Sequence, residues 1–194
     1  MEIKKLENIN IIKLINRQIL LDEEFKKKDI KTNIKRDVKN NLVAMAVECG
    51  EMAQEIKKSW CYWKNNFNYE EGKFIEEMSD YLHFLLQYIY NNEKLFEELK
   101  ENEFDFNLEL NQTINSFSTI KGSEKLDVTQ ACLHLYLPLS YELLGYEVGV
   151  AEIYSLFIAM YTLLYRHDIS LGVFLETHHN KFEKNYYERT KENY

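Results

Sequence analysis

The sequence predicts an all-α fold, a multi-helix bundle formed by one domain over residues 1–194. Proline occurs once and glycine six times, so the chain has few of the breakers that a many-turned β fold requires. Hydrophobic residues make up 45% of the chain, which is enough for a core, and they recur at spacings of three and four. No stretch rich in glycine, serine or proline marks a second domain.

Three long helices are expected in the first half of the chain. The first covers about residues 6–28, where isoleucine and leucine recur at helical spacing. The second covers about 38–64, with Asp37 or Asn40 placed to cap its start. The third covers about 73–99 and carries its apolar residues on one side. These three helices hold most of the residues that suggest chemistry.

The second half is expected to begin with a connection and continue as shorter helices. Residues 100–123 are polar and less periodic, and we interpret them as a long connection that could include a short helix. The C-terminal helices should lie between about 124 and 190. Pro138 should kink or break the first of them, the stretch 145–149 should turn, and Asp168 is placed to cap the last.

Charge and composition exclude several classes of protein. The net charge is -8 and the basic residues form no long block, which argues against binding of polymeric nucleic acid. No apolar run reaches the roughly 18 to 20 residues of a membrane span, and the N-terminus lacks the apolar region of a signal peptide. The three cysteines (Cys49, Cys61 and Cys132) fit no disulfide framework, so we expect a cytoplasmic protein.

Two pairs of acidic residues indicate a metal site. Glu48 and Glu51 lie three residues apart on the second helix, and Glu77 and Asp80 do so on the third, so each pair shares a helix face. Both pairs lie in or beside apolar stripes, where four anions are tolerated only if cations neutralise them. Carboxylates are the ligands that magnesium prefers, and a magnesium cluster suits phosphoryl chemistry. Exposed helices often carry the same spacing merely for solubility, and one pair alone would not decide the matter.

Four motifs in order resemble the dimeric all-α dUTPase family, within the superfamily of MazG-like nucleotide pyrophosphatases. Residues 47–53 (VECGEMA) are similar to its V-E-L-G-E-L-A, and residues 58–65 (KSWCYWKN) to an aromatic stretch ending in W-K-N. Residues 77–84 (EMSDYLHF) resemble E-x-x-D-x-x-H-F, and residues 17–22 (RQILLD) resemble L-Q-x-x-L-D. The likeness spans nearly the whole chain and is weakest in the region interpreted as a connection.

The resemblance implies hydrolysis of dUTP, and also of dUDP, to dUMP by a homodimer that depends on magnesium, for which manganese could substitute. It implies that all four acids ligate the metal and that one of the first pair, Glu48 or Glu51, positions the attacking water. The residues that match pocket-lining positions of the family are Gln18, Trp60, Trp63, Lys64, Asn65 and His83. Trp60 and His83 could equally serve as core residues. The apolar and aromatic residues of the helix over 150–165 add to the expectation of a dimer.

The C-terminal helix matches the family less closely. Lys181, Asn185 and Arg189 are four apart and share a face, as a lysine, an asparagine and an arginine do in the family. Counting back from Arg189 by the family's spacing places Tyr186 at the asparagine position, and Asn193 stands where the family has glycine. Arg189 is therefore the foremost phosphate-binding candidate of the three. A basic last turn that complements the helix dipole is the alternative.

Three other functions compete with dUTP hydrolysis. A pyrophosphatase of the same fold could act on another nucleotide such as dCTP, because a few hydrogen bonds decide which base is accepted. A di-iron or di-manganese oxidase would use Glu-x-x-His motifs; Glu176 and His179 fit that pattern, whereas Asp80 and His83 replace its glutamate with aspartate. A non-catalytic binding module is the third, but the retention of all four acids argues against it.

Overall fold

The structure is a computed structural model, and it describes residues 8–27, 36–66, 68–117 and 126–188. Over these stretches the chain forms nine α-helices, one 3-10 helix and no strand, which confirms the predicted all-α class. The helices are α1 (Ile11–Lys26), α2 (Val38–Glu55), α3 (Glu71–Asn91), α4 (Glu93–Glu101), α5 (Glu103–Ser116), α6 (Val128–His134), α7 (Leu137–Leu144), α8 (Val150–Arg166) and α9 (Leu171–Tyr187), with the 3-10 helix η1 at Lys57–Ser59.

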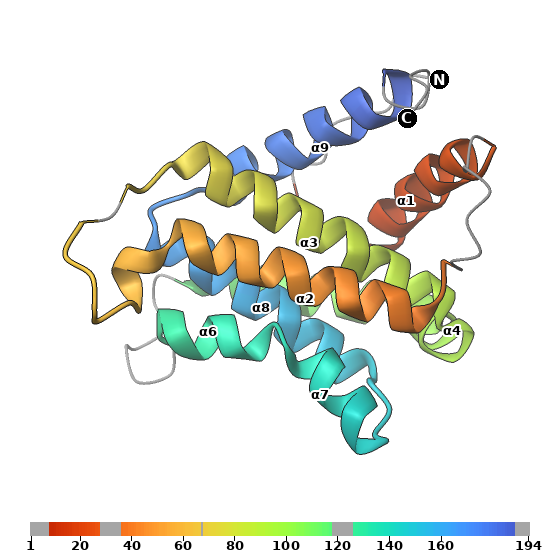
Figure 1. Ribbon diagram of the computed structural model, residues 1–194. Helices are drawn as coiled ribbons and strands as arrows, with labels where there is room; N and C mark the ends of the chain where they lie inside the picture. Colours follow the sequence, from red (N-terminus) through yellow and green to blue (C-terminus); the bar gives the residue numbers. More distant parts are fainter. Residues whose placement is uncertain (1–7, 28–35, 67, 118–125, 189–194) are drawn as a thin grey trace.

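The centre of the molecule is the pair α2 and α3, which lie side by side in opposite directions (Figure 1). Their facing residues recur at spacings of three and four and are fully or almost fully buried: Leu42, Met45, Cys49 and Met52 on α2, and Phe74, Met78, Tyr81, Leu82 and Leu85 on α3. Burial of these two stripes against each other fixes how the helices align. It therefore also fixes which of their polar residues face one another.

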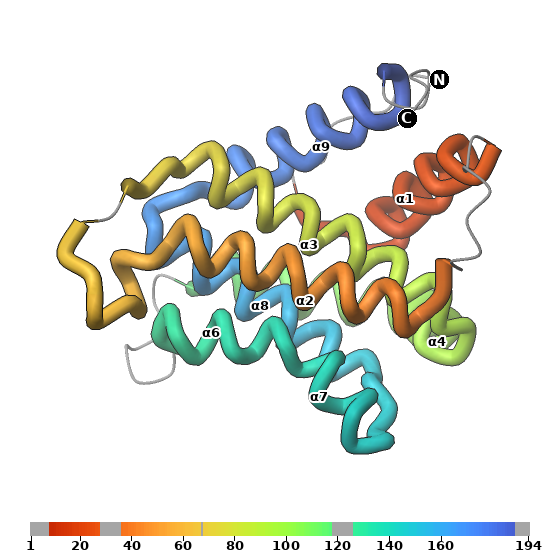
Figure 2. Tube along the Cα trace, in the orientation of Figure 1, coloured from red at the N-terminus to blue at the C-terminus, as the bar shows by residue number. Residues whose placement is uncertain are grey.

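The remaining helices cover this pair on two sides (Figure 2). Helices α1 and α9 pack on α3 and on each other. Helix α8 is apolar on most of its surface, and α4, α5, α6 and α9 pack around it. No helix in the described part of the chain is long and apolar enough to cross a membrane.

The expected connection over residues 100–123 is wrong, because most of it is helical. Helix α5 occupies 103–116 and buries Phe106, Leu110 and Ile114 at four-residue spacing. Phe106 meets Phe157 of α8 with ring centroids 6.3 Å apart. The polar residues that surround these three apolar positions belong to the exposed face of an amphipathic helix rather than to a loop.

The expected helices over 38–64 and 73–99 both end earlier. Helix α2 stops at Glu55, and η1 and turns follow. The indole Nε1 of Trp60 donates to the backbone oxygen of Ala53 at 2.7 Å, so the chain folds back on the end of the helix. Helix α3 stops at Asn91, and the side chain of Asn92 caps α4 by accepting from the backbone NH of Leu95 at 3.3 Å.

Of the expected caps and breaks, most are confirmed. Asp37 caps α2 by accepting from the backbone NH of Asn40 at 3.0 Å. Pro138 lies in the first turn of α7, so the expected helix breaks just before it. Asp168 does not cap α9; it has a φ of 59°, and Ser170 caps that helix instead.

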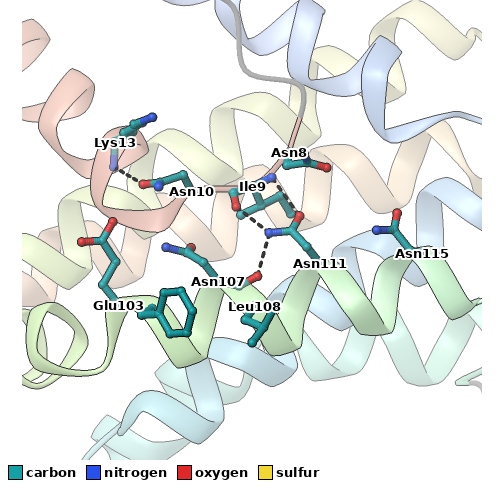
Figure 3. Close-up of a pocket in the computed structure, with 10 residues that line it drawn as sticks. Asn8, Ile9, Asn10, Lys13, Glu103, Asn107, Leu108, Asn111 and Asn115 are labelled. Atoms are coloured by element: carbon teal, nitrogen blue, oxygen red, sulfur yellow. Dashed lines mark hydrogen bonds between the residues drawn. The ribbon is translucent and has the colours of Figure 1, made fainter.

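Two asparagines of α5 hold the stretch before α1 in place (Figure 3). Asn111 accepts from the backbone NH of Ile9 at 3.1 Å and donates to its oxygen at 2.7 Å, while Asn107 accepts from the NH of Ile11 at 2.9 Å. A pocket of about 800 Å³ lies beside this clamp. It is lined by the segment 8–13 and by α5, not by the central pair.

Candidate functional site

Helices α2 and α3 bring three carboxylates together. Each of Glu48, Glu51 and Glu77 offers an oxygen, and these oxygens lie within 4.8 Å of one another. Among the described residues, no other group of three or more potential metal ligands lies so close together. Glu48 and Glu77 are partly buried and Glu51 is exposed. The acidic cluster, as we call these three residues, follows from the alignment of the two buried stripes.

The negative charges of the acidic cluster repel one another. Burial is the largest of the causes that raise the pKa of Glu48 to about 7; the negative charges of Asp80, Glu51 and Glu77 contribute to this rise, whereas Lys181 opposes it. Burial and the charges of Glu51 and Asp80 likewise raise the pKa of Glu77. Ionised carboxylates packed so closely are stabilised by a cation, and a set of ligands made of oxygen alone suits magnesium.

The fourth predicted acid, Asp80, lies outside the acidic cluster and is paired with Lys181. The ammonium group of Lys181 donates to Asp80 Oδ2 and also to the backbone oxygen of Glu76, the latter at 3.2 Å. These contacts join α9 to α3 beside the acidic cluster. The structure therefore places two sequence-predicted residues, one for metal and one for phosphate, in direct contact with each other.

Gln18 and His83, two predicted pocket residues, meet in the interior. His83 Nδ1 and Gln18 Oε1 are 2.6 Å apart. His83 is 6% exposed, and its Nε2 has no hydrogen-bond partner in the described part of the chain. Burial lowers the pKa of His83 well below its usual value, as do the nearby His178 and Lys181, so the ring is neutral. Asn185 Oδ1 is likewise buried without a partner.

The predicted pocket residues of the aromatic stretch lie in the loop between η1 and α3. Trp60 is partly buried against the core, and its ring meets that of Trp63 edge to face with centroids 5.6 Å apart. Trp63 is 59% exposed, and Lys64 and Asn65 are exposed beside it. Trp60 thus belongs to the core and also supports an exposed ring. Arg189 lies outside the described residues.

Sequence reasoning assigned no role to Asp22, Asn41 and Gln87, although all three are buried polar residues. They connect by hydrogen bonds to Gln18 and so to His83. A signal was available, since Gln87 interrupts an apolar run on α3 and Asp22 follows buried Leu21. A polar residue on the buried stripe of an amphipathic helix is expected to have a polar partner.

The arrangement does not match a di-iron or di-manganese oxidase. Among the described residues, His83 and His179 are not part of the group of close potential ligands. His83 Nδ1 faces Gln18, Asp80 is paired with Lys181, and His179 Nε2 lies 3.6 Å from Glu183 on its own helix. The two histidine motifs are therefore not gathered around one centre.

The fold and the site together define a class of protein, namely a helical bundle with a carboxylate cluster on its central helix pair that could hold a divalent cation. A family model described as dUTPase matches residues 10–194. The chain therefore belongs to this dUTPase family, which confirms the family resemblance. No curated protein and no solved structure matches the chain.

Proposed function

We propose that this protein hydrolyses dUTP to dUMP and pyrophosphate with magnesium as its cofactor, that manganese can substitute, and that dUDP is also a substrate. The observation that carries the proposal is the approach of three carboxylates to within 4.8 Å on facing helices. In a member of a dUTPase family, such a cluster has the chemistry needed to bind a metal–triphosphate complex.

Each acid has a proposed role. Glu48, Glu51 and Glu77 would hold magnesium, and the bound metal would supply positive charge to offset that of the phosphates. Asp80 would be a further ligand, and Lys181, which pairs with Asp80 in this structure, would contact a phosphate oxygen. One of the first pair also orients the attacking water and accepts its proton. Glu48 is favoured over Glu51 for this step, because Glu48 is partly buried and Glu51 is exposed.

The remaining predicted residues have proposed roles in holding the nucleotide. Gln18, His83 and Asn185 offer polar groups in the interior, and buried acceptors without a partner favour a ligand that donates to them. The exposed face of Trp63, supported by Trp60, is suited to stacking on a base. Lys64, Asn65, Lys181 and Arg189 are proposed to contact the sugar and phosphates.

Release of pyrophosphate from a panel of deoxynucleoside triphosphates, with and without magnesium, tests the proposed function. We expect dUTP to be cleaved at least about tenfold faster than any other member, and cleavage to stop when the metal is chelated. Faster cleavage of dCTP would move the substrate to another base while leaving the chemistry in place. Equal release from dUTP with and without a chelator would refute the metal-dependent mechanism.

We also propose that two copies associate, and a face besides the expected one is suited to this. The expected one, the apolar helix over 150–165, buries Ile153, Phe157 and Leu164 among others in the core of its own chain, while Tyr154, Ile158 and Tyr161 of α8 are only partly buried. Val43 and Val47 are instead exposed on one stripe of α2, and Leu143, Leu144 and Tyr146 are exposed at the end of α7. Lys39 precedes Val43 by one turn and approaches Glu142 of α7 to 3.8 Å, so the two groups lie together.

Two broader expectations remain proposals of the same kind. We propose that residues 1–194 form one domain, because a single core cluster contains residues from α1 to α9. We propose a cytoplasmic location, because Cys49, Cys61 and Cys132 are free thiols. Localisation of a tagged protein and limited proteolysis test these two points.

A further inference from the structure

Two sets of side-chain amides converge on one buried carboxylate, that of Asp22. Asp22 is 1% exposed. Its Oδ1 accepts from Gln18 Nε2 and from Gln87 Nε2, each at 2.9 Å, and its Oδ2 accepts from the hydroxyl of Tyr90. Arg36 Nη1 lies 3.7 Å from Oδ1. A buried carboxylate with several donors is satisfied. Because an ionised carboxylate only accepts hydrogen bonds, each group that contacts it must act as a donor.

The first set of amides begins on α3, passes through α2 and returns to α3 before it reaches Asp22. Asn91 Nδ2 donates to Asn41 Oδ1 at 2.8 Å, Asn41 Nδ2 donates to Gln87 Oε1 at 2.8 Å, and Gln87 donates to Asp22. Each amide therefore donates in the direction of Asp22. A side-chain amide can reverse its oxygen and nitrogen, so the direction of the whole chain depends on the acceptor at its end.

The second set runs from Asp22 to His83. Because the Nε2 of Gln18 donates to Asp22, its Oε1 faces His83 Nδ1 at 2.6 Å. Oε1 can only accept, so Nδ1 of the ring carries the proton. In a neutral imidazole the other nitrogen is then a bare acceptor. That nitrogen, Nε2, is the buried atom without a partner.

We propose that Asp22 is a positioning residue of the substrate site, which fixes the Gln18 amide and the His83 tautomer so that His83 Nε2 presents a lone pair to a hydrogen-bond donor of the nucleotide. This inference rests on the proposed function for the identity of the ligand, but its geometric part concerns the free protein. Asp22 acts through Gln18 and makes no contact with the substrate itself.

A carboxylate is required at this place because it accepts at both oxygens. Asparagine has the same shape but supplies a donor, so with Asp22→Asn both amide chains can run in either direction. In the reversed state, Gln18 Nε2 donates to His83 Nδ1 and the proton moves to Nε2. His83 Nε2 is then a donor that faces the donor of the substrate, so no hydrogen bond forms between them.

The matched control is Tyr90→Phe. It removes one hydrogen bond to the same carboxylate and leaves an acceptor at both oxygens. If the network served only stability, the two variants would behave alike. Under our proposal only Asp22→Asn changes the tautomer and the binding of nucleotide.

Side-chain nitrogen-15 spectra of the full chain report the tautomer, with the His83 signals assigned from their loss in His83→Gln. We expect the parent and Tyr90→Phe to carry the proton on Nδ1, and Asp22→Asn to show both tautomers. We also expect KM for dUTP to rise about tenfold in Asp22→Asn with kcat changed by less than about threefold. Tyr90→Phe should keep KM within about twofold of the parent value.

The parent spectrum alone can overturn the proposal, even if Asp22→Asn fails to fold, because a proton found on His83 Nε2 would contradict it. An unchanged tautomer in folded Asp22→Asn, or an equal rise in KM in both variants, would also contradict it. If the parent shows the expected tautomer but does not hydrolyse dUTP, the proposed function fails and the arrangement around Asp22 stands.

Discussion

At Glu48, burial and the negative charges of neighbouring acids act together and raise the pKa of the side chain to about 7. We expect Glu48→Gln to lower dUTP hydrolysis by about two to three orders of magnitude, because an amide neither accepts the proton of water nor binds magnesium well. Glu76→Gln is the matched control, since Glu76 is exposed on α3 next to Glu77 and outside the acidic cluster. Rates measured at saturating magnesium decide this, and a loss of similar size in both variants would remove Glu48 from the mechanism.

The raised pKa of Glu48 also predicts how stability depends on pH without metal. Between pH 4.5 and about 7 the side chain is ionised in the unfolded chain but protonated in the folded one. Raising the pH through this window therefore lowers the free energy of unfolding, and the loss is complete above about 7. Glu48→Gln has no carboxyl group to ionise, so it does not lose stability in this way. Its free energy of unfolding relative to the parent should therefore rise by about 1 kcal/mol across the window, after allowance for solvent screening.

Urea unfolding in the presence of a chelator, at several values of pH from 4.5 to 8, measures this difference. Saturating magnesium should abolish the advantage of Glu48→Gln, because the metal binds the ionised acid of the parent. A difference between the two proteins that does not change with pH would show that Glu48 has an ordinary pKa.

Single residues could be predicted from sequence when their role depended on near neighbours. Glu48 and Glu51 share a helix face by spacing alone, and their approach to Glu77 follows from two apolar stripes. Asp22 and Gln87 were not assigned, because their contact joins residues 65 positions apart. Their place among apolar residues indicated that they are buried and need polar partners, but no local pattern identifies the partner.

At the scale of elements, α5 shows why a polar segment can still be a helix. Only Phe106, Leu110 and Ile114 are buried along it, and so narrow an apolar stripe is difficult to recognise in the sequence among polar residues. The α2 helix was predicted too long because its apolar stripe continues in the sequence beyond the residue at which the helix ends. Trp60 continues its apolar stripe but reaches the core from a turn, through a hydrogen bond to Ala53 that periodicity does not reveal.

The stripe on α5 predicts unequal effects of the same substitution on one helix. Leu110 is fully buried and Leu108 is 44% exposed. We expect Leu110→Ala to lower the free energy of unfolding by about 2 to 4 kcal/mol, because it leaves a cavity beneath the helix. Leu108→Ala should cost less than about 1 kcal/mol. Chemical denaturation compares the two, and equal losses would mean that α5 does not pack as described.

At the scale of the whole molecule, the core accounts for most apolar residues, and the exposed ones include a set on α2 and a set at the end of α7. Helix α8 carries apolar residues on most of its surface, and the bundle buries many of them, among them Leu156, Phe157 and Leu163. The exposed valines of α2 and leucines of α7 are not required by the core. Sequence could not separate these two uses of apolar surface, because burial depends on which helices pack together.

The proposed association of two copies is tested at Val47, which is 52% exposed on α2. Val47→Asp places a charge where a partner would cover it, and burying an unpaired charge is costly. We expect the parent to sediment at about twice the 23.4 kDa chain mass at micromolar concentration, and Val47→Asp to sediment as a monomer. Val173→Asp, the same change at an exposed position of α9, should leave the dimer intact. A parent that sediments as a monomer would refute the association, and a dimer unaffected by Val47→Asp would move the interface to another face.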